Sequence, residues 1–178
     1  LQTCFIWHGR PEERAAGREN SKKVFYFARQ YGLLDLADRD QPTCHSWLHH
    51  LAPGEHVDSS RWQWETWVEQ EKRSRVMFLI FLLDAALTIY FNCESEFDPM
   101  EIRLPLPCDD AAWDATDAQS CAQALGLHGT ELQATKNISG SLRLKQLEMH
   151  HMLSALHDVS VTLEPQMTNV YSKFILIH

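Results

Sequence analysis

The chain has 178 residues, of which 44% are hydrophobic and 22% charged, and this composition suits a single domain with a sizeable buried core. Its net charge of -8 argues against direct binding to a nucleic-acid backbone, which requires clustered Lys and Arg. The five cysteines are widely spaced and odd in number, which argues against a disulfide framework and indicates free thiols.

The N-terminal part alternates apolar and polar segments. It opens in mid-pattern on Leu1 rather than Met, so we expect a piece of a longer protein, with residues 1–8 as the end of an apolar helix. Residues 8–20 are polar and contain two Gly and one Pro, which predicts a loop or a frayed turn. Residues 21–31 carry apolar side chains at helical spacing, and Gly32 predicts the end of that helix.

The best-defined predicted element begins at Ser60. Ser60 and Gln63 have the spacing of a capping box, and no Gly or Pro follows until after Tyr90. Residues 76–91 are apolar on all sides apart from one acid and one threonine, which is typical of a helix inside a large core or a membrane. The run is shorter than the ~20 apolar residues of a membrane span and holds an acid, so we predict a buried core helix.

Two charges fall within the apolar stripe of this helix. At about 100° per residue, Glu71 and Arg75 share a face with Trp64 and Trp67. Charges on a core-facing stripe are costly unless paired, so we predict a buried Glu71–Arg75 ion pair. The alternative is that both side chains reach solvent at the edge of the stripe. Asp84 lies on the opposite side of the helix and also needs a partner.

The C-terminal half has shorter elements. Residues 104–107 read L-P-L-P and must be extended, because each Pro moves its predecessor out of the helical region. Asp109 or Asp110 is expected to cap a short helix through Trp113, and a second short helix is expected over 116–126. A longer helix is predicted over 142–159, and the apolar tail from residue 170 is ambiguous between an irregular end and the start of another helix.

Metal-binding and catalytic motifs are weak. The densest group of candidate zinc ligands is Cys44, His45, His49, His50 and His56, all but the last within a short helix expected over 43–51. His45 and His49 share a helix face, but a second ligand pair is missing and Ser46 stands where a metalloprotease has Glu, so we predict no zinc and no cofactor in this chain. His150 and His151 are expected at the surface. The sequence has no nucleophile elbow, phosphate loop or dinucleotide motif, so we predict that the chain is not an enzyme.

Three ordered blocks resemble one known family. The long predicted helix carries a W-x2-W-x3-E-x3-R-x2-F-x2-F-x2-D pattern, formed by Trp64, Trp67, Glu71, Arg75, Phe78, Phe81 and Asp84. Residues 28–34 read A-R-Q-Y-G-L-L, and Leu104 and Pro105 begin an L-P-L-P stretch that is followed by Trp113. Together these blocks resemble the fungal-specific transcription factor domain, or middle homology region, over residues 1–115. The family usually has two adjacent arginines, and here Ser74 takes the place of the first, with Arg73 and Arg75 beside it.

The resemblance implies an all-α fold, an irregular multi-helix domain with one long central buried helix over about Ser60–Tyr90. It implies one regulatory domain over 1–178, with residues 1–115 best supported and a structural role for the signature residues. In this family such a domain follows a DNA-binding module, either a binuclear zinc cluster or zinc fingers, whose zinc ligands are absent from this chain.

The function implied by the resemblance is control of a fungal RNA polymerase II transcription factor in the nucleus. DNA would be contacted only by the longer protein, and the expected partner is a small-molecule effector or a transcriptional co-regulator. A homodimer is left open, and no membrane association is expected. The alternative is an orphan helical domain that binds a small molecule or has a metabolic role unrelated to transcription.

Overall fold

The computed structural model describes residues 6–36, 62–125, 148–160 and 169–177. All regular secondary structure within these ranges is helical, which confirms the predicted all-α class; the only β features there are two isolated bridges. In chain order, the elements are α2 (Pro11–Gln30), α4 (Trp64–Phe91), the 3-10 helix η2 (Pro99–Glu101), α5 (Asp110–Trp113), α6 (Ala118–Leu125), α8 (Met149–His157) and α9 (Val170–Ile177).

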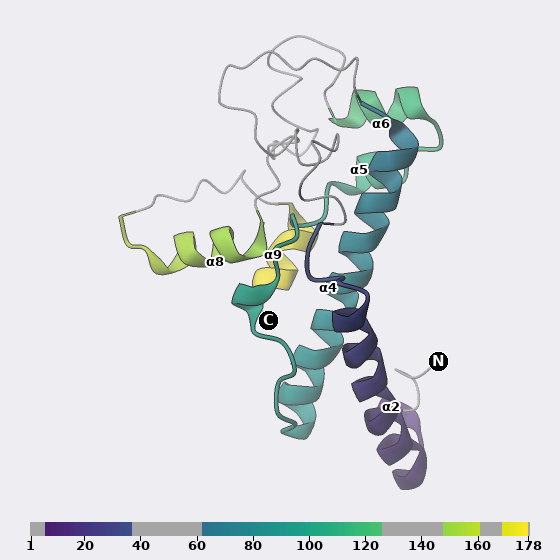
Figure 1. Ribbon diagram of the computed structural model, residues 1–178, viewed down its shortest axis with the longest axis vertical. Coiled ribbons are helices and arrows are strands. Elements are labelled where there is room, and N and C mark those ends of the chain that lie inside the picture. The colour runs from purple at the N-terminus through teal and green to yellow at the C-terminus, as the bar shows by residue number, and fades with distance from the viewer. Residues whose placement is uncertain (1–5, 37–61, 126–147, 161–168, 178) are drawn as a thin grey trace.

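Helices α2 and α4 run side by side in opposite directions, purple and blue-green in Figure 1. Helix α2 buries Gly17, Ser21, Phe25 and Ala28, which recur every three or four residues. It ends as predicted at Gly32, which has a φ of 58°, and the Leu33 N–H donates to the Ala28 carbonyl over 2.8 Å. This arrangement is a Schellman motif, which needs a left-handed residue at the position of Gly32.

The loop predicted over residues 8–20 is wrong, because α2 already begins at Pro11. Proline fits the first turn of a helix, where its missing N–H costs no hydrogen bond. Gly17 remains inside the helix because a Cβ there would lie 2.8 Å from Cγ1 of Ile6. The glycine therefore allows the preceding segment to pack closely against α2.

Helix α4 begins at Trp64, with Gln63 as its N-cap, so the predicted start at Ser60 is wrong; Ser60 itself lies outside the described residues. The helix ends at Phe91, and Asn92 follows it with a φ of 52°. It is central, but it is buried along one side only, since Leu79 and Ile89 are each 59% exposed. The nearly apolar composition of residues 76–91 therefore does not correspond to burial on every side.

By length and composition, α4 is also the one helix among the described residues that could cross a membrane. It carries two acids, Glu71 and Asp84, that are each 1% exposed and accept hydrogen bonds from the rest of the protein. Acids with protein partners are typical of the core helix of a folded domain.

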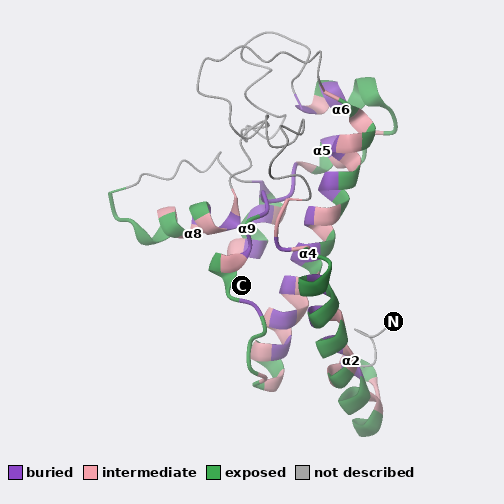
Figure 2. Cartoon of the chain, viewed as in Figure 1, coloured by how far each residue is buried: buried purple, intermediate pink, exposed green. Residues whose placement is uncertain are grey.

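The buried side chains form two clusters along α4. The larger cluster joins α2, the C-terminal half of α4, the segment after it, α8 and α9, and Phe78, Phe81 and Leu104 are among its buried members. The smaller cluster packs Trp67 against α5 and α6. Residues 104–108 are all buried and run as non-helical chain between the elements, as predicted for 104–107 (purple in Figure 2).

The C-terminal predictions are confirmed in part. Helix α6 matches the helix predicted over 116–126, and the Asp117 carboxylate caps it by accepting from the Ser120 N–H over 2.9 Å. Within the described residues, helix α8 covers Met149–His157 of the predicted 142–159; it ends before Asp158, and Val159 is fully exposed. The apolar tail forms α9. The helix expected over 43–51, the zinc-ligand group there and residues 142–147 lie outside the described residues.

Candidate functional site

The Glu71–Arg75 ion pair lies at the centre of the polar interactions on α4. Nε of Arg75 donates to Oε1 of Glu71 over 2.8 Å. The same Oε1 accepts from the backbone N–H of Cys108 over 3.0 Å, and Nη2 of Arg75 donates to the Cys108 carbonyl over 3.0 Å. The two side chains thus bind both backbone groups of Cys108, which lies 33 residues beyond Arg75 in the chain.

Helix α9 and Asn169, the residue before it, bind the neighbouring backbone group. The carbonyl of Pro107 accepts from Nδ2 of Asn169 over 2.7 Å and from the Ser172 hydroxyl over 3.1 Å. Asn169 also caps α9, because its Oδ1 accepts from the Ser172 N–H over 2.7 Å. We call this set, made of Glu71, Arg75, Asn169, Ser172 and the backbone of residues 107–108, the polar junction.

Two aromatic rings enclose the guanidinium of Arg75. It lies 4.5 Å from the ring centre of Trp113 in α5 and 5.5 Å from that of Tyr171 in α9. Such cation–π contacts are strongest where water is excluded. Arg75 thereby joins α4, α5 and α9 through a single side chain.

Burial and charge oppose each other at Arg75. Burial alone would lower its pKa, but the hydrogen bond and the charge of Glu71 raise the pKa above its ordinary value. The pKa of the Cys108 thiol lies well above its ordinary value, chiefly because of burial and also because of the charge of Glu71. Arg75 is therefore charged and the Cys108 thiol neutral, so the junction contains an ion pair and no thiolate nucleophile.

Asp84 finds its partners in the turn that follows α4. Its carboxylate accepts from the Ser95 hydroxyl over 3.0 Å and from the backbone N–H groups of Glu96 and Phe97 over 3.0 to 3.1 Å. Next to this turn, Arg29 of α2 pairs with Glu101 over 2.6 Å and donates to the Glu96 carbonyl. These contacts fix the segment that leads from α4 to residues 104–108.

The structure shows what Ser74 and Arg73 do where the family usually has two adjacent arginines. Ser74 is 2% exposed in the core, and Arg73 turns to the end of α2 instead. Nε of Arg73 donates to the Asp35 carbonyl over 3.1 Å, and Nη2 donates to the carbonyls of Tyr31 and Gly32. Arg73 thus binds carbonyls just beyond the C-terminus of α2, while Arg75 serves the polar junction.

The predicted signature residues separate into two groups in space. Trp64, Trp67 and Trp113 belong to the smaller core cluster, and Phe78, Phe81 and Leu104 to the larger one. Pro105 forms an isolated bridge with Glu148, just before α8. Glu71 and Arg75 are joined directly, whereas Asp84 lies apart in its own contact with the turn. Sequence reasoning missed Asn169 and Ser172, because their partner is a carbonyl 62 and 65 residues away.

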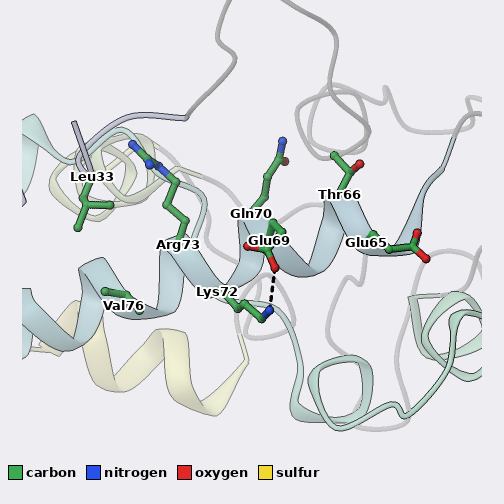
Figure 3. A pocket seen from close by; sticks show the side chains of 8 residues that line it. All are labelled: Leu33, Glu65, Thr66, Glu69, Gln70, Lys72, Arg73 and Val76. Carbon is green, nitrogen blue, oxygen red and sulfur yellow. Dashed lines mark hydrogen bonds and ion pairs between the residues drawn. The ribbon is translucent and has the colours of Figure 1, made fainter. Parts of the chain in front are cut away.

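A shallow hollow of about 630 Å³ lies on the N-terminal half of α4, beside the end of α2 (Figure 3). Side chains of both charges line it, together with apolar ones; the set is Leu33, Glu65, Thr66, Glu69, Gln70, Lys72, Arg73 and Val76. A second polar group lies at the start of α8, where Glu148, His150 and His151 bring potential metal ligands within 4.8 Å of one another. His151 is exposed as predicted, but His150 is only 20% exposed and contacts Glu148 over 3.3 Å.

Comparisons with known proteins find one matching family model and partial matches to fungal proteins. A family model described as "Fungal specific transcription factor domain" matches residues 49–173, well over half of the chain. The chain is 33% identical over 63 residues to zinc finger protein klf1 of Schizosaccharomyces pombe, covering 35% of this chain and 8% of that protein. It is 24% identical over 62 residues to transcription factor PfmaH of Pestalotiopsis fici, covering 35% and 6%. The chain thus spans less than a tenth of either relative, and no solved structure matches it.

Proposed function

The chain belongs to the family of fungal specific transcription factor domains, and from this premise we propose that it is the regulatory region of a longer RNA polymerase II transcription factor whose DNA-binding module lies outside it. The family match and the relatives favour a role in transcription regulation over the alternative, an orphan helical domain that has a metabolic role. We propose that the chain has no enzymatic activity.

The observation that best supports a regulatory role is the polar junction. A buried ion pair contributes little net stability compared with apolar side chains of the same volume, but it requires one specific arrangement of its partners. Here the Glu71–Arg75 pair binds the Cys108 backbone, and α9 binds the adjacent Pro107 carbonyl. A small shift of α9 relative to α4 would break several of these contacts together. We propose that an effector or partner changes the domain by favouring or breaking this arrangement.

The charge of the chain supports a DNA-binding module elsewhere. Its 16 Lys and Arg face 24 Asp and Glu. In the densest basic run, Arg75 belongs to the polar junction, Arg73 caps α2, and Lys72 pairs with Glu69 over 2.7 Å. Each phosphate contact needs a free cation, so we expect no binding to random duplex DNA at about 50 mM salt. Micromolar binding that weakens steeply with added salt would move the DNA-contacting role into this chain.

The remaining parts of the proposal follow from the family. One relative is named a zinc finger protein, and we propose that zinc belongs to the DNA-binding module of the longer protein and not to this chain. Purified chain should then contain less than one zinc per molecule by elemental analysis, and one tightly held zinc would overturn this. We further propose a nuclear location, and a small-molecule effector or a transcriptional co-regulator as partner. A homodimer is compatible with the exposed apolar side of α4.

A tethered reporter tests the regulatory role directly. The chain is inserted between a heterologous DNA-binding domain and an activation domain, and reporter output in a fungal host is compared with that of the same fusion without the chain. We expect the chain to change the output at equal protein level. Equal output with and without the chain, in all growth conditions tested, would refute the proposal.

A further inference from the structure

Gln70 is a buried side chain whose hydrogen-bonding groups are unused. It lies in the first half of α4 and is 7% exposed. Its Oε1 is shielded from solvent and has no hydrogen-bond partner, and no described group bonds to its amide nitrogen. Most buried polar atoms in native proteins are paired, because an unpaired one destabilises the fold. An unpaired amide with this degree of burial therefore calls for a ligand.

Gln70 lines the hollow on α4, and a rotation of its side chain would present the shielded Oε1 to a ligand bound there. Figure 3 shows Gln70 and Thr66 projecting to the same side of the helix, with Leu33 and Val76 farther along the same hollow. The Thr66 hydroxyl is already used, since it donates to Oε1 of Gln63 over 3.2 Å. The volume of about 630 Å³ is within the range of small-molecule sites, which is about 300–1,000 Å³.

The charges around the hollow favour a neutral ligand. Two acids and two bases line it, and Lys72 and Glu69 neutralise each other over 2.7 Å. Arg73 is committed to carbonyls at the end of α2. The remaining acid, Glu65, lies at the far end of the row of side chains in Figure 3. Leu33 and Val76 supply the apolar surface against which a ligand ring could pack.

We propose that this hollow binds a neutral small molecule that carries a cyclic cis-amide, such as a lactam. A primary amide side chain presents one acceptor and one donor along a single edge. Only a ligand with N–H and C=O on the same side can pair with both, as an amide held cis within a ring does. An open-chain trans amide directs these two groups oppositely and makes one bond only. This inference rests on the proposed regulatory function, for which it names the class of effector.

Two matched probes test the pairing. In ¹⁵N-labelled chain, ε-caprolactam should shift the side-chain NH₂ resonances of Gln70 and saturate with a Kd of about 1 mM, as suits a fragment of this size. N-methyl-ε-caprolactam has the same ring and carbonyl but no N–H to donate to Oε1. It should bind about tenfold more weakly, since one hydrogen bond to a buried acceptor is lost. Equal binding of the two probes, or no shift of Gln70 by either at about 10 mM, would overturn the proposal.

Two matched variants separate a binding role from a structural one. Gln70→Met keeps the length of the side chain and removes the unpaired amide, so it should leave Tm unchanged or higher while lactam binding weakens at least tenfold. Gln119→Met, at an exposed position of α6, should change neither. Lactam binding by Gln70→Met at the wild-type level, or a marked fall in its Tm, would show that Gln70 serves the fold instead. Because this experiment does not use the reporter, its result can refute the proposed ligand class without refuting the proposed regulatory role.

Discussion

Replacing Arg75 by Ala removes one partner of a buried ion pair. Glu71, which is 1% exposed, would keep the Cys108 N–H as a donor but lose the positive charge that balances its carboxylate. Leaving one charge of a buried pair without its partner costs about 3–5 kcal/mol. The Arg75 side chain is 15% exposed, so water can partly reach the site, and we expect the lower part of this range. Losing the contact with the Trp113 ring adds about 0.5–1 kcal/mol.

Urea unfolding followed by circular dichroism measures this loss. The matched control is Lys72→Ala, which breaks an exposed pair with Glu69 on the same helix and should cost less than about 0.5 kcal/mol. The double variant Glu71→Leu/Arg75→Met removes both charges and should recover most of the stability, because no unpaired charge stays buried. A loss below about 1 kcal/mol for Arg75→Ala, close to that of the control, would refute the reasoning.

Three other changes have defined outcomes. Asp84→Asn turns an amide towards backbone N–H groups and should lower the free energy of unfolding in urea by about 2–3 kcal/mol; a change within error would contradict the assigned contacts. Gly17→Ala should lower Tm, because overpacking against Ile6 costs about 1–3 kcal/mol and outweighs the helix propensity gained; a raised Tm would show that the contact relaxes freely. Burial raises the pKa of the Cys108 thiol and raises that of Cys121 from 9.0 to about 12. Since folding favours the protonated thiol, the contribution of Cys121 is complete below pH 9.0 and is lost as the pH rises towards about 12, so Cys121→Ala should reduce the fall of Tm above pH 9.0.

The sequence allowed prediction of the features that depend on periodicity within one helix. The 3.6-residue period placed Glu71 and Arg75 together on a face that also carries Trp67, and the structure pairs them there. The same reasoning showed that Asp84 needed a partner but could not identify one. Its partners are backbone N–H groups of a later turn, which any residue type could supply.

Features that depend on tertiary contact could not be predicted. Gly17 and Pro11 indicated a loop, because the close approach of Ile6 that makes glycine suitable inside α2 is invisible in the local pattern. In the sequence, Arg73 stands out only as a neighbour of Ser74, which takes the place of an arginine. Its role at the end of α2 depends on how α2 and α4 are placed beside each other. The part played by α9 is of the same kind, since Asn169 binds a carbonyl distant in the chain.

The central claim is that the polar junction of a fungal transcription factor domain controls the output of the longer protein. The most direct test compares three versions of the chain in the tethered reporter, at protein levels matched by immunoblot: wild type, Lys22→Ala, which breaks an exposed pair on α2, and Glu71→Leu/Arg75→Met. The double variant should remain folded but lack the ion pair. We predict that it loses the effect of the wild-type chain on reporter output, while Lys22→Ala keeps it. A double variant that regulates the reporter as the wild type does would contradict the claim.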